Sequence, residues 1–215
     1  VDSLYSDLTG RELFANLVNL SKMDGSRSYY VPWMQASFVM VANRKALKYL
    51  PKGANLDSLT YVQLAEWAKA MREATGKAQL GFPAGDKGLM HRFFQGYAYP
   101  SYTGSTLLRF RSADAAVMWT YMRELWHDVN PGSLSYSTMD EPLIIEDVWV
   151  AWDHTARLKK AFETKPDDFV AFPAPIGPKG RGFMSVITGL AIPKGNPDAA
   201  SAEALIDYLT LPGIQ

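Results

Sequence analysis

The sequence has no cysteine among its 215 residues. A disulfide framework and any cysteine-built zinc or iron–sulfur site are therefore excluded. The sequence also lacks an excess of charge of either sign, because 22 lysines and arginines balance 22 acidic residues and no basic block occurs. Long-range attraction to nucleic acid or to an anionic membrane is therefore not expected. The absence of cysteine suits the cytoplasm and the periplasm equally, so it does not identify a compartment.

Long hydrophobic runs are missing as well. The longest, such as 38–42 and 186–192, fall far short of the roughly 20 residues that cross a bilayer, so we expect no transmembrane segment. The chain opens without an initiating methionine and without the sections of a signal peptide, and we expect it to be part of a longer protein. Its 47% of hydrophobic residues are typical of a globular chain that forms one large domain or two small ones.

Caps and apolar spacing predict four helices. One begins at a capping box formed by Thr9 and Glu12, and another at the same box in Thr60 and Gln63. The predicted helices cover about 10–24, 61–75, 112–129 and 197–210, the last of them capped by Asn196. Short strands rich in β-branched and aromatic residues are predicted at 29–31, 37–42, 80–82, 148–152, 169–172 and 185–192. Strands that alternate with helices predict an α/β fold whose sheet is at least partly parallel.

Catalysis has weak support in the sequence. Asp153 and His154 could form a pair, but adjacent residues of an extended strand point to opposite faces. Neither a Gly-x-Ser-x-Gly elbow nor a His-Glu-x-x-His motif accompanies them. The carboxylates within 140–153 leave open an alternative, a glycan-active hydrolase with an acid and a nucleophile. We interpret them as solvated loop charge, and we predict no catalytic residue, no metal site and no cofactor.

Aromatic residues are the most informative feature, at 13% of the chain. Several lie at predicted strand ends and in loops, where a ring can offer a flat apolar face to the C–H face of a sugar. Trp33 and Trp149 are the strongest candidates for such stacking. Core packing is the other interpretation of each ring, and it gives a further alternative, a non-catalytic interaction module.

Four segments, in chain order, carry a resemblance to a known family. They are the tyrosine-proline strand and apolar strand of 29–47, the tryptophan strand 149–153, the pair 168–175 and 189–195, and the closing helix 199–209. Together they resemble the extracellular solute-binding proteins of carbohydrate ABC transporters, family 1. Members are about twice as long as this chain, so the resemblance implies a fragment.

The resemblance implies a two-lobe, periplasmic-binding-protein-like α/β fold. Residues 1–35 would belong to lobe one and lead into the first crossover, 36–166 would form lobe two, and 167–215 would return into lobe one. The proline- and glycine-rich segment 172–182 is interpreted as a boundary or hinge.

The implied function is that of the substrate-binding component of an ABC importer. The protein would bind a carbohydrate or related polyol in an interlobe cleft, without turnover, and present it to the permease subunits. The implied location is periplasmic or extracellular, with a lipid anchor at the cell surface in the full-length form.

The residues expected at the ligand come partly from the aromatic pattern and partly from the resemblance. The tryptophans and the aspartate near residue 150 follow the family pattern, and the loop at 181–184 follows from its position in the family. The candidate ligand-binding residues are Tyr30, Trp33, Gln35, Asp86, His91, Tyr102, Trp149, Trp152, Asp153, Arg181, Phe183 and Met184.

Overall fold

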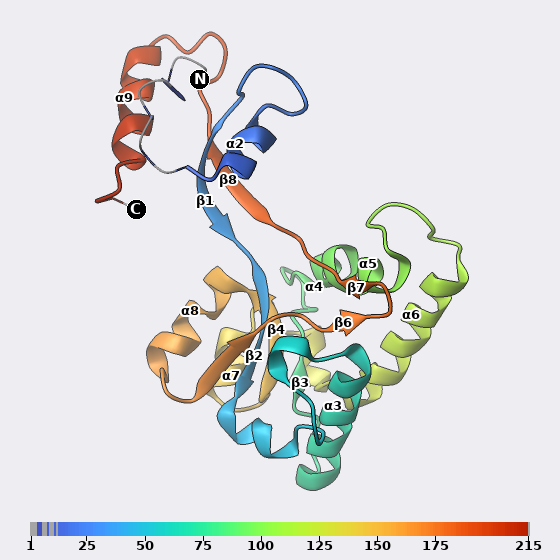
Figure 1. Cartoon of the computed structure of the whole chain (residues 1–215). Coiled ribbons are helices and arrows are strands. Elements are labelled where there is room, and N and C mark those ends of the chain that lie inside the picture. Colours follow the sequence, from blue (N-terminus) through green and yellow to red (C-terminus); the bar gives the residue numbers. More distant parts are fainter. Residues whose placement is uncertain (1–3, 6–7, 9–10, 12, 215) are drawn as a thin grey trace. The chain divides into compact units, whose positions relative to one another are not determined.

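The computed structural model describes residues 4, 5, 8, 11 and 13–214 (Figure 1). The chain divides into a smaller unit, Val1–Ala36 with Ser185–Gln215, and a larger unit, Ser37–Met184. The α- and π-helices are α2(Ala15–Ser21), α3(Tyr61–Thr75), α4(Met90–Phe93), the π-helix η3(Phe94–Ala98), α5(Tyr99–Thr103), α6(Ala113–Leu125), α7(Asp140–Ile144), α8(Thr155–Thr164) and α9(Ala199–Leu209). The strands are β1(Val31–Ala36), β2(Phe38–Asn43), β3(Leu80–Gly81), β4(Val150–His154), β5(Phe169–Phe172), β6(Ile176–Gly177), β7(Gly180–Arg181) and β8(Val186–Leu190).

The cap signals in the middle of the chain predicted helices correctly. The Thr60 side chain accepts a hydrogen bond from the backbone N–H of Gln63, and the Gln63 side chain accepts one from the N–H of Thr60, so the expected capping box begins α3. The helix ends at Gly76, whose positive φ of 74° is favoured in glycine. Ser112 caps α6 in the same way by accepting from the N–H of Ala115.

The predictions for the helix near the N-terminus have a different outcome. The predicted Thr9 and Glu12 box lies outside the described residues. Helix α2 ends at Ser21, earlier than expected, and Met23 and Asp24 then take positive φ angles that cannot continue a helix.

The cap of the last helix was predicted at the wrong residue. Asp198 caps α9 by accepting from the N–H of Ser201, whereas the side chain of Asn196 accepts from the N–H of Asp198 itself. The predicted strand at 29–31 was also displaced, because β1 begins only at Val31.

The larger unit is built on a four-stranded sheet in the order β3-β4-β2-β5. Strand β4 runs parallel to β3 and antiparallel to β2, and β2 runs antiparallel to β5, which confirms a sheet that is only partly parallel. Because side chains alternate along a strand, neighbouring residues of β2 and β4 face opposite sides. Helices cover both sides, so both sets of side chains are buried.

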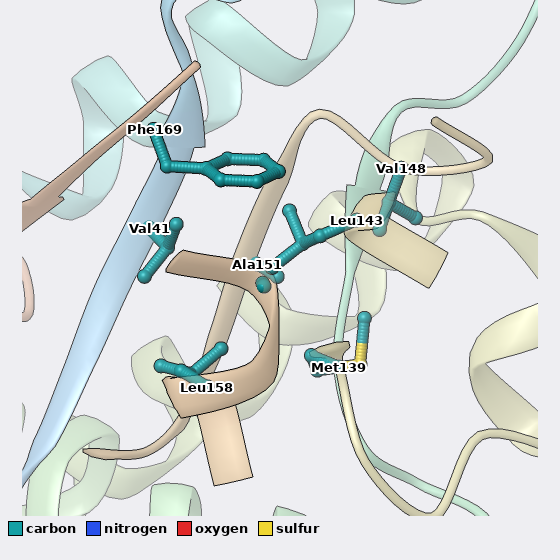
Figure 2. Close-up of a cluster of buried hydrophobic side chains, with 8 residues drawn as sticks. Val41, Met139, Leu143, Val148, Ala151, Leu158 and Phe169 are labelled. Carbon is teal, nitrogen blue, oxygen red and sulfur yellow. The ribbon is translucent and has the colours of Figure 1, made fainter. Parts of the chain in front are cut away.

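One face of this sheet packs against α7 and α8. Figure 2 shows the cluster, in which Val41, Ala151 and Phe169 of the strands meet Leu143 and Leu158 of the helices. The other face carries large aromatic rings. There Trp152 packs edge-on against Phe93 and Tyr97, and Trp67 of α3 meets Phe172, so this layer is mostly aromatic.

The smaller unit is organised by an antiparallel pair, β1 and β8. Val31 is fully buried there and packs in one cluster with Leu4, Leu8 and Ile206 of α9. The register shifts between Pro32 and Met34, as expected beside a proline that cannot donate to the ladder. Within the described part of the chain, no helix is long and apolar enough to cross a membrane.

The larger unit extends past residue 167, where the predicted return into lobe one begins, and the division into lobes stays a prediction. We expected the return into the first lobe to begin at 167, but the larger unit extends to Met184. The physical reason is that β5 pairs with β2 in the middle of the main sheet, and the β6–β7 hairpin follows it within the same unit. The chain therefore crosses between the units after Ala36 and after Met184.

Candidate functional site

A cavity of about 360 Å³ lies at the end of the main sheet where the chain enters and leaves the larger unit. We call it the sheet-end cavity. Its lining residues are Ser37, Phe38, Val39, Tyr97, Ala171, Phe172, Pro173, Ala174, Arg181, Gly182 and Phe183. The lining comes from the start of β2, the end of β5, the π-helix and the segment after β7, and all of it belongs to the larger unit.

Aromatic rings make up much of this lining. Phe38 is almost fully buried, and its ring lies parallel to the indole of Trp152 with centroids 4.7 Å apart. Tyr97 meets the Phe38 ring edge-on at 5.9 Å. Phe183, in contrast, is 59% exposed. The cavity thus combines fixed rings in its wall with one ring that is open to solvent, which is suitable for stacking on an apolar face of a ligand.

The segment that closes the cavity is fixed by close backbone packing. A methyl group on Gly182 would overlap the carbonyl oxygen of Tyr97, so this approach requires glycine. The Ser101 hydroxyl accepts from the N–H of Gly182 at 2.8 Å and donates to the carbonyl of Tyr97 at 2.7 Å. The Tyr97 hydroxyl donates to the carbonyl of Met184 at 3.3 Å. These bonds hold 182–184 against the π-helix.

Arg181 supplies the cationic group of the cavity lining. Its Nε donates to the carbonyl of Ala174 at 2.8 Å, and Nη2 donates to the carbonyl of Asp57. These bonds tie the hairpin to two other loops and fix the guanidinium beside the cavity. The remaining N–H groups suit the hydroxyls of a polar ligand.

Two expected ligand contacts on β4 are part of the protein core. Trp152 is 0% exposed and lies beneath Phe38, so a ligand cannot reach its ring without repacking the core. Asp153 points to the other face of the sheet and accepts from the N–H groups of Met139 at 2.9 Å and His154 at 2.7 Å. Burial raises the pKa of Asp153 to about 6 despite these donors. In this structure both side chains therefore pack in the core of the larger unit.

Tyr102 is also a core residue. Its ring lies 5.5 Å from that of Tyr61 and 5.9 Å from that of Tyr121, in a cluster of three tyrosines on α3, α5 and α6. Burial raises the pKa of Tyr102 to about 12. It lines a separate cavity of about 480 Å³ on that side of the unit.

Trp149 lies at the opposite end of β4 from the sheet-end cavity. Its backbone carbonyl accepts from the N–H of Asn43 at the far end of β2, whereas Phe38 and His154 pair at the cavity end. The half-buried indole stacks near Tyr49 at 6.1 Å, with the ammonium of Lys45 4.7 Å from its centre. The structure therefore gives no support to stacking of a ligand on Trp149 in this cavity.

The other expected residues are spread over several places. Trp33 and Gln35 line a cavity of about 550 Å³ in the smaller unit, and His91 lines one of about 340 Å³ beside α6. Of the twelve candidates, only Arg181 and Phe183 line the sheet-end cavity. The residues that line none of these four cavities are Tyr30, Asp86, Trp149, Trp152, Asp153 and Met184.

Several of the acidic residues considered for a hydrolase have structural partners. Glu146 pairs with Lys45 and Lys165, and the hydrogen bond from Lys45 is the main cause of its lowered pKa. The Tyr136 hydroxyl donates to the carboxylate of Asp147. Among the described residues, no group of three or more potential ligands could hold a metal ion.

Phe38, Tyr97 and Phe172 were not expected to line the cavity. A signal existed in the sequence, because Phe38 is the second residue of one predicted strand and Phe172 ends another, and both strand ends border a predicted boundary of the chain. No such signal existed for Tyr97, whose position depends on a π-helix. π-helices are rare and concentrate at functional sites.

Solved structures share the fold. The chain resembles maltose-bound MalE3 of T. maritima, with 20% identity and a TM-score of 0.76 over 96% of this chain and 56% of that one. It also resembles a solute-binding protein of Agrobacterium vitis S4 with bound D-mannitol, with 17% identity and a TM-score of 0.74 over 97% and 54%. UgpB of Mycobacterium tuberculosis, in complex with glycerophosphocholine, gives 18% identity and 0.73 over 97% and 54%. The chain thus spans little more than half the length of these proteins.

No curated protein matches the sequence. A family model does, and it covers nearly the whole chain. Its description is "bacterial extracellular solute-binding protein", and it matches residues 4–215. As the four sequence segments predicted, the chain belongs to the family of bacterial extracellular solute-binding proteins.

Proposed function

We propose that this chain is part of the substrate-binding component of an ABC importer and that the sheet-end cavity holds a carbohydrate or a related polyol. The observation that carries the proposal is the set of aromatic rings around a cavity at the point where the chain crosses twice between its units. Maltose and D-mannitol, bound by the similar MalE3 and A. vitis proteins, support this ligand class. Apolar ring faces and a fixed guanidinium suit a ligand with C–H faces and hydroxyls.

The two units are proposed to be the parts of lobe one and lobe two in this chain, with the crossings after Ala36 and Met184 as the hinge. Contacts that a ligand makes only in a closed state would shift the hinge equilibrium toward closure. The closed form would then be presented to the permease subunits. The proposed location is the periplasm or the extracellular space, and a lipid anchor on the full-length protein stays a prediction.

Isothermal titration calorimetry with maltose and D-mannitol, and with leucine as a negative control, tests the proposal. Phe183→Ala should lower the affinity for the bound sugar or polyol by roughly 1 to 3 kcal/mol, because an exposed stacking ring is lost while the core is untouched. Phe110→Ala is the matched control, since Phe110 is also an exposed phenylalanine of the larger unit and does not line this cavity.

Equal losses in the two variants, or none in Phe183→Ala, would remove the sheet-end cavity as the site. Binding without turnover is tested by incubation with oligosaccharides and analysis of products. Released shorter sugars would favour the hydrolase alternative instead.

A further inference from the structure

The loop between α5 and α6 carries apolar side chains into solvent. We call residues 105–111 the 105–111 loop; Figure 1 shows it in light green between the two helices. Leu107 is 73% exposed, and Leu108 and Phe110 are each 68% exposed. Single exposed apolar residues are common, but three in four consecutive positions at the tip of a loop are the kind of patch that marks an interaction site.

Polar bonds fix the shape of this loop without burying those side chains. The Ser105 hydroxyl accepts from the N–H groups of Leu107 at 3.2 Å and Leu108 at 3.0 Å. The Tyr99 hydroxyl donates to the carbonyl of Leu108, and the Tyr99 ring stacks on Phe110 with centroids 4.9 Å apart. The loop is therefore ordered in advance, with its apolar tip left in water.

The backbone of the loop is also strained at its centre. Arg109 has a φ of +71°, in the left-handed region that non-glycine residues rarely adopt. Such outliers concentrate where a local conformation serves a function. Here the strained residue, Arg109, stands between two exposed apolar residues, Leu108 and Phe110.

The apolar surface continues from the loop onto α6. Leu107, Phe110 and Trp119 line the same cavity of about 340 Å³, and Trp119 is itself exposed. The rings of Trp119 and Phe94 lie 5.0 Å apart on the other wall. The patch is thus continuous from the tip of the loop to an indole, which is a side chain suited to the boundary between water and lipid.

The 105–111 loop carries two arginines and no acidic residue, and Asp114 follows in the first turn of α6. Residues 87–113 include four basic residues and no acidic one, although the whole chain has a net charge of zero. Arg92, Arg109 and Arg111 of this stretch are exposed. The zero net charge of the whole chain thus conceals a local excess of positive charge. A planar guanidinium is well suited to bind two phosphate oxygens at once.

We propose that the 105–111 loop docks on the surface of an anionic phospholipid bilayer, with Leu107, Leu108 and Phe110 in the interfacial layer and Arg109 and Arg111 on lipid phosphates. Interfacial anchors need to enter only about 5 to 10 Å, which a loop tip can do. A stable protein partner would need a broad complementary face of roughly 800 Å². A narrow apolar tip with two exposed arginines in the same loop favours the lipid surface. This inference does not rest on the proposed solute site.

Co-sedimentation of the chain with vesicles tests the proposal. One set of vesicles contains phosphatidylcholine alone, and the other contains phosphatidylcholine with phosphatidylglycerol. We expect at least about tenfold stronger partition onto the anionic vesicles, because each basic residue near such a surface contributes favourably, and we expect salt to weaken it. The triple variant Leu107→Ser, Leu108→Ser, Phe110→Ser should lose about tenfold or more.

A matched control removes three exposed apolar side chains elsewhere on the larger unit. The variant Val62→Ser, Leu134→Ser, Ile145→Ser changes the same number of exposed apolar residues and should keep wild-type partition. For the charge, Arg109→Gln with Arg111→Gln is compared with Lys52→Gln and Lys77→Gln, both exposed on the same unit. Only the arginine pair should weaken binding to anionic vesicles.

The absence of cysteine allows a direct measure of insertion. A single environment-sensitive NBD label on Leu108→Cys should brighten and shift to the blue on anionic vesicles, and the same label on Leu134→Cys should not. Equal partition onto both kinds of vesicle, equal losses in the test and control variants, or an unchanged label at position 108 would each overturn the proposal. Binding only to membranes that contain the transporter would assign the loop to a protein partner instead and would also overturn it.

Discussion

Two tryptophans close together in the sequence, one within strand β4 and one just before it, lie in opposite environments. Trp152, in the middle of β4, stacks on Phe38 of the cavity end and is sealed in an aromatic layer beneath the sheet-end cavity. Trp149, which precedes the other end, is half-buried below the ammonium of Lys45. Four residues along a strand separate its ends by about 13 Å. The role of each ring is therefore decided by its position along the sheet and by the side chains around it, and not by the residue type.

The chemistry of the two ends differs accordingly. Rings dominate the cavity end, and the chain leaves the unit from there. The far end has an ionic cluster in which Glu146 pairs with Lys45 and Lys165, and the backbone of Glu146 takes a φ of +64°. Partly exposed ion pairs contribute little to stability individually, so this end tolerates change better than the aromatic layer does.

The largest expected effect is at the cavity end. Trp152→Ala should lower the free energy of unfolding by about 3 to 5 kcal/mol, because a fully buried indole stacked on Phe38 is replaced by a void. Urea denaturation monitored by circular dichroism measures it. Trp152→Phe should cost much less, since it keeps a stacked ring and removes an indole N–H for which no described residue provides a partner. Comparable costs for both variants would contradict the stacking model.

The second-largest expected effect is a pH dependence of the free energy of unfolding, which Asp153 of β4 should cause. The pKa of Asp153 is raised to about 6, mainly by burial, with Asp140 also raising it and Arg157 lowering it. The folded state therefore holds this proton more tightly than the unfolded state. The resulting stability is fully present below about pH 4 and is lost as the pH rises through about 6, by roughly 3 kcal/mol in total.

Asp153→Asn should remove that fall in stability between pH 4 and pH 7, measured by urea denaturation at each pH. The comparison is between slopes, because asparagine also replaces one of the two oxygens that accept from Met139 and His154. Asp86→Asn, which removes an exposed carboxylate, serves as the control and should keep the wild-type slope. If both variants keep that slope, the buried carboxylate is not its source.

The smallest effect is expected at the far end. Trp149→Ala should cost only about 1 to 2 kcal/mol, since the indole is half-buried and its contacts are Tyr49 and a cation. Sugar affinity should stay within about twofold of wild type by calorimetry, in contrast to Phe183→Ala. A tenfold loss of affinity would return Trp149 to the binding site and erase the difference between the two ends.

Local signals in the sequence predicted local structure well. The capping box of Thr60 and Gln63 and the stop at Gly76 are set by residues within a few positions of each other, and α3 formed as predicted. Helix α8 was missed because its buried stripe contains only Leu158 and Ala161, too few to show a helical period.

The candidate site was harder to predict because it depends on contacts that are distant in sequence. Alternation along β4 shows that Trp152 and Asp153 face opposite sides, but not that helices cover both sides. Tyr97 lines the cavity because it lies on a π-helix, and Gly182 packs against Tyr97 although the two residues are far apart in the sequence. Phe183 was predicted from its position in the family, but the cavity around it could be identified only once the fold was known.

The Ser101 hydroxyl has a consequence for how the chain can bend. Through this one oxygen and the crowding at Gly182, the last residues before the second crossing are fastened to α5 and the π-helix. The backbone is therefore held to the larger unit up to Met184, and only Ser185 separates that residue from β8. In the proposed hinge, this fastening would limit the pivot at the second crossing to a short length of chain, and the buried Ser101 would set where that length starts.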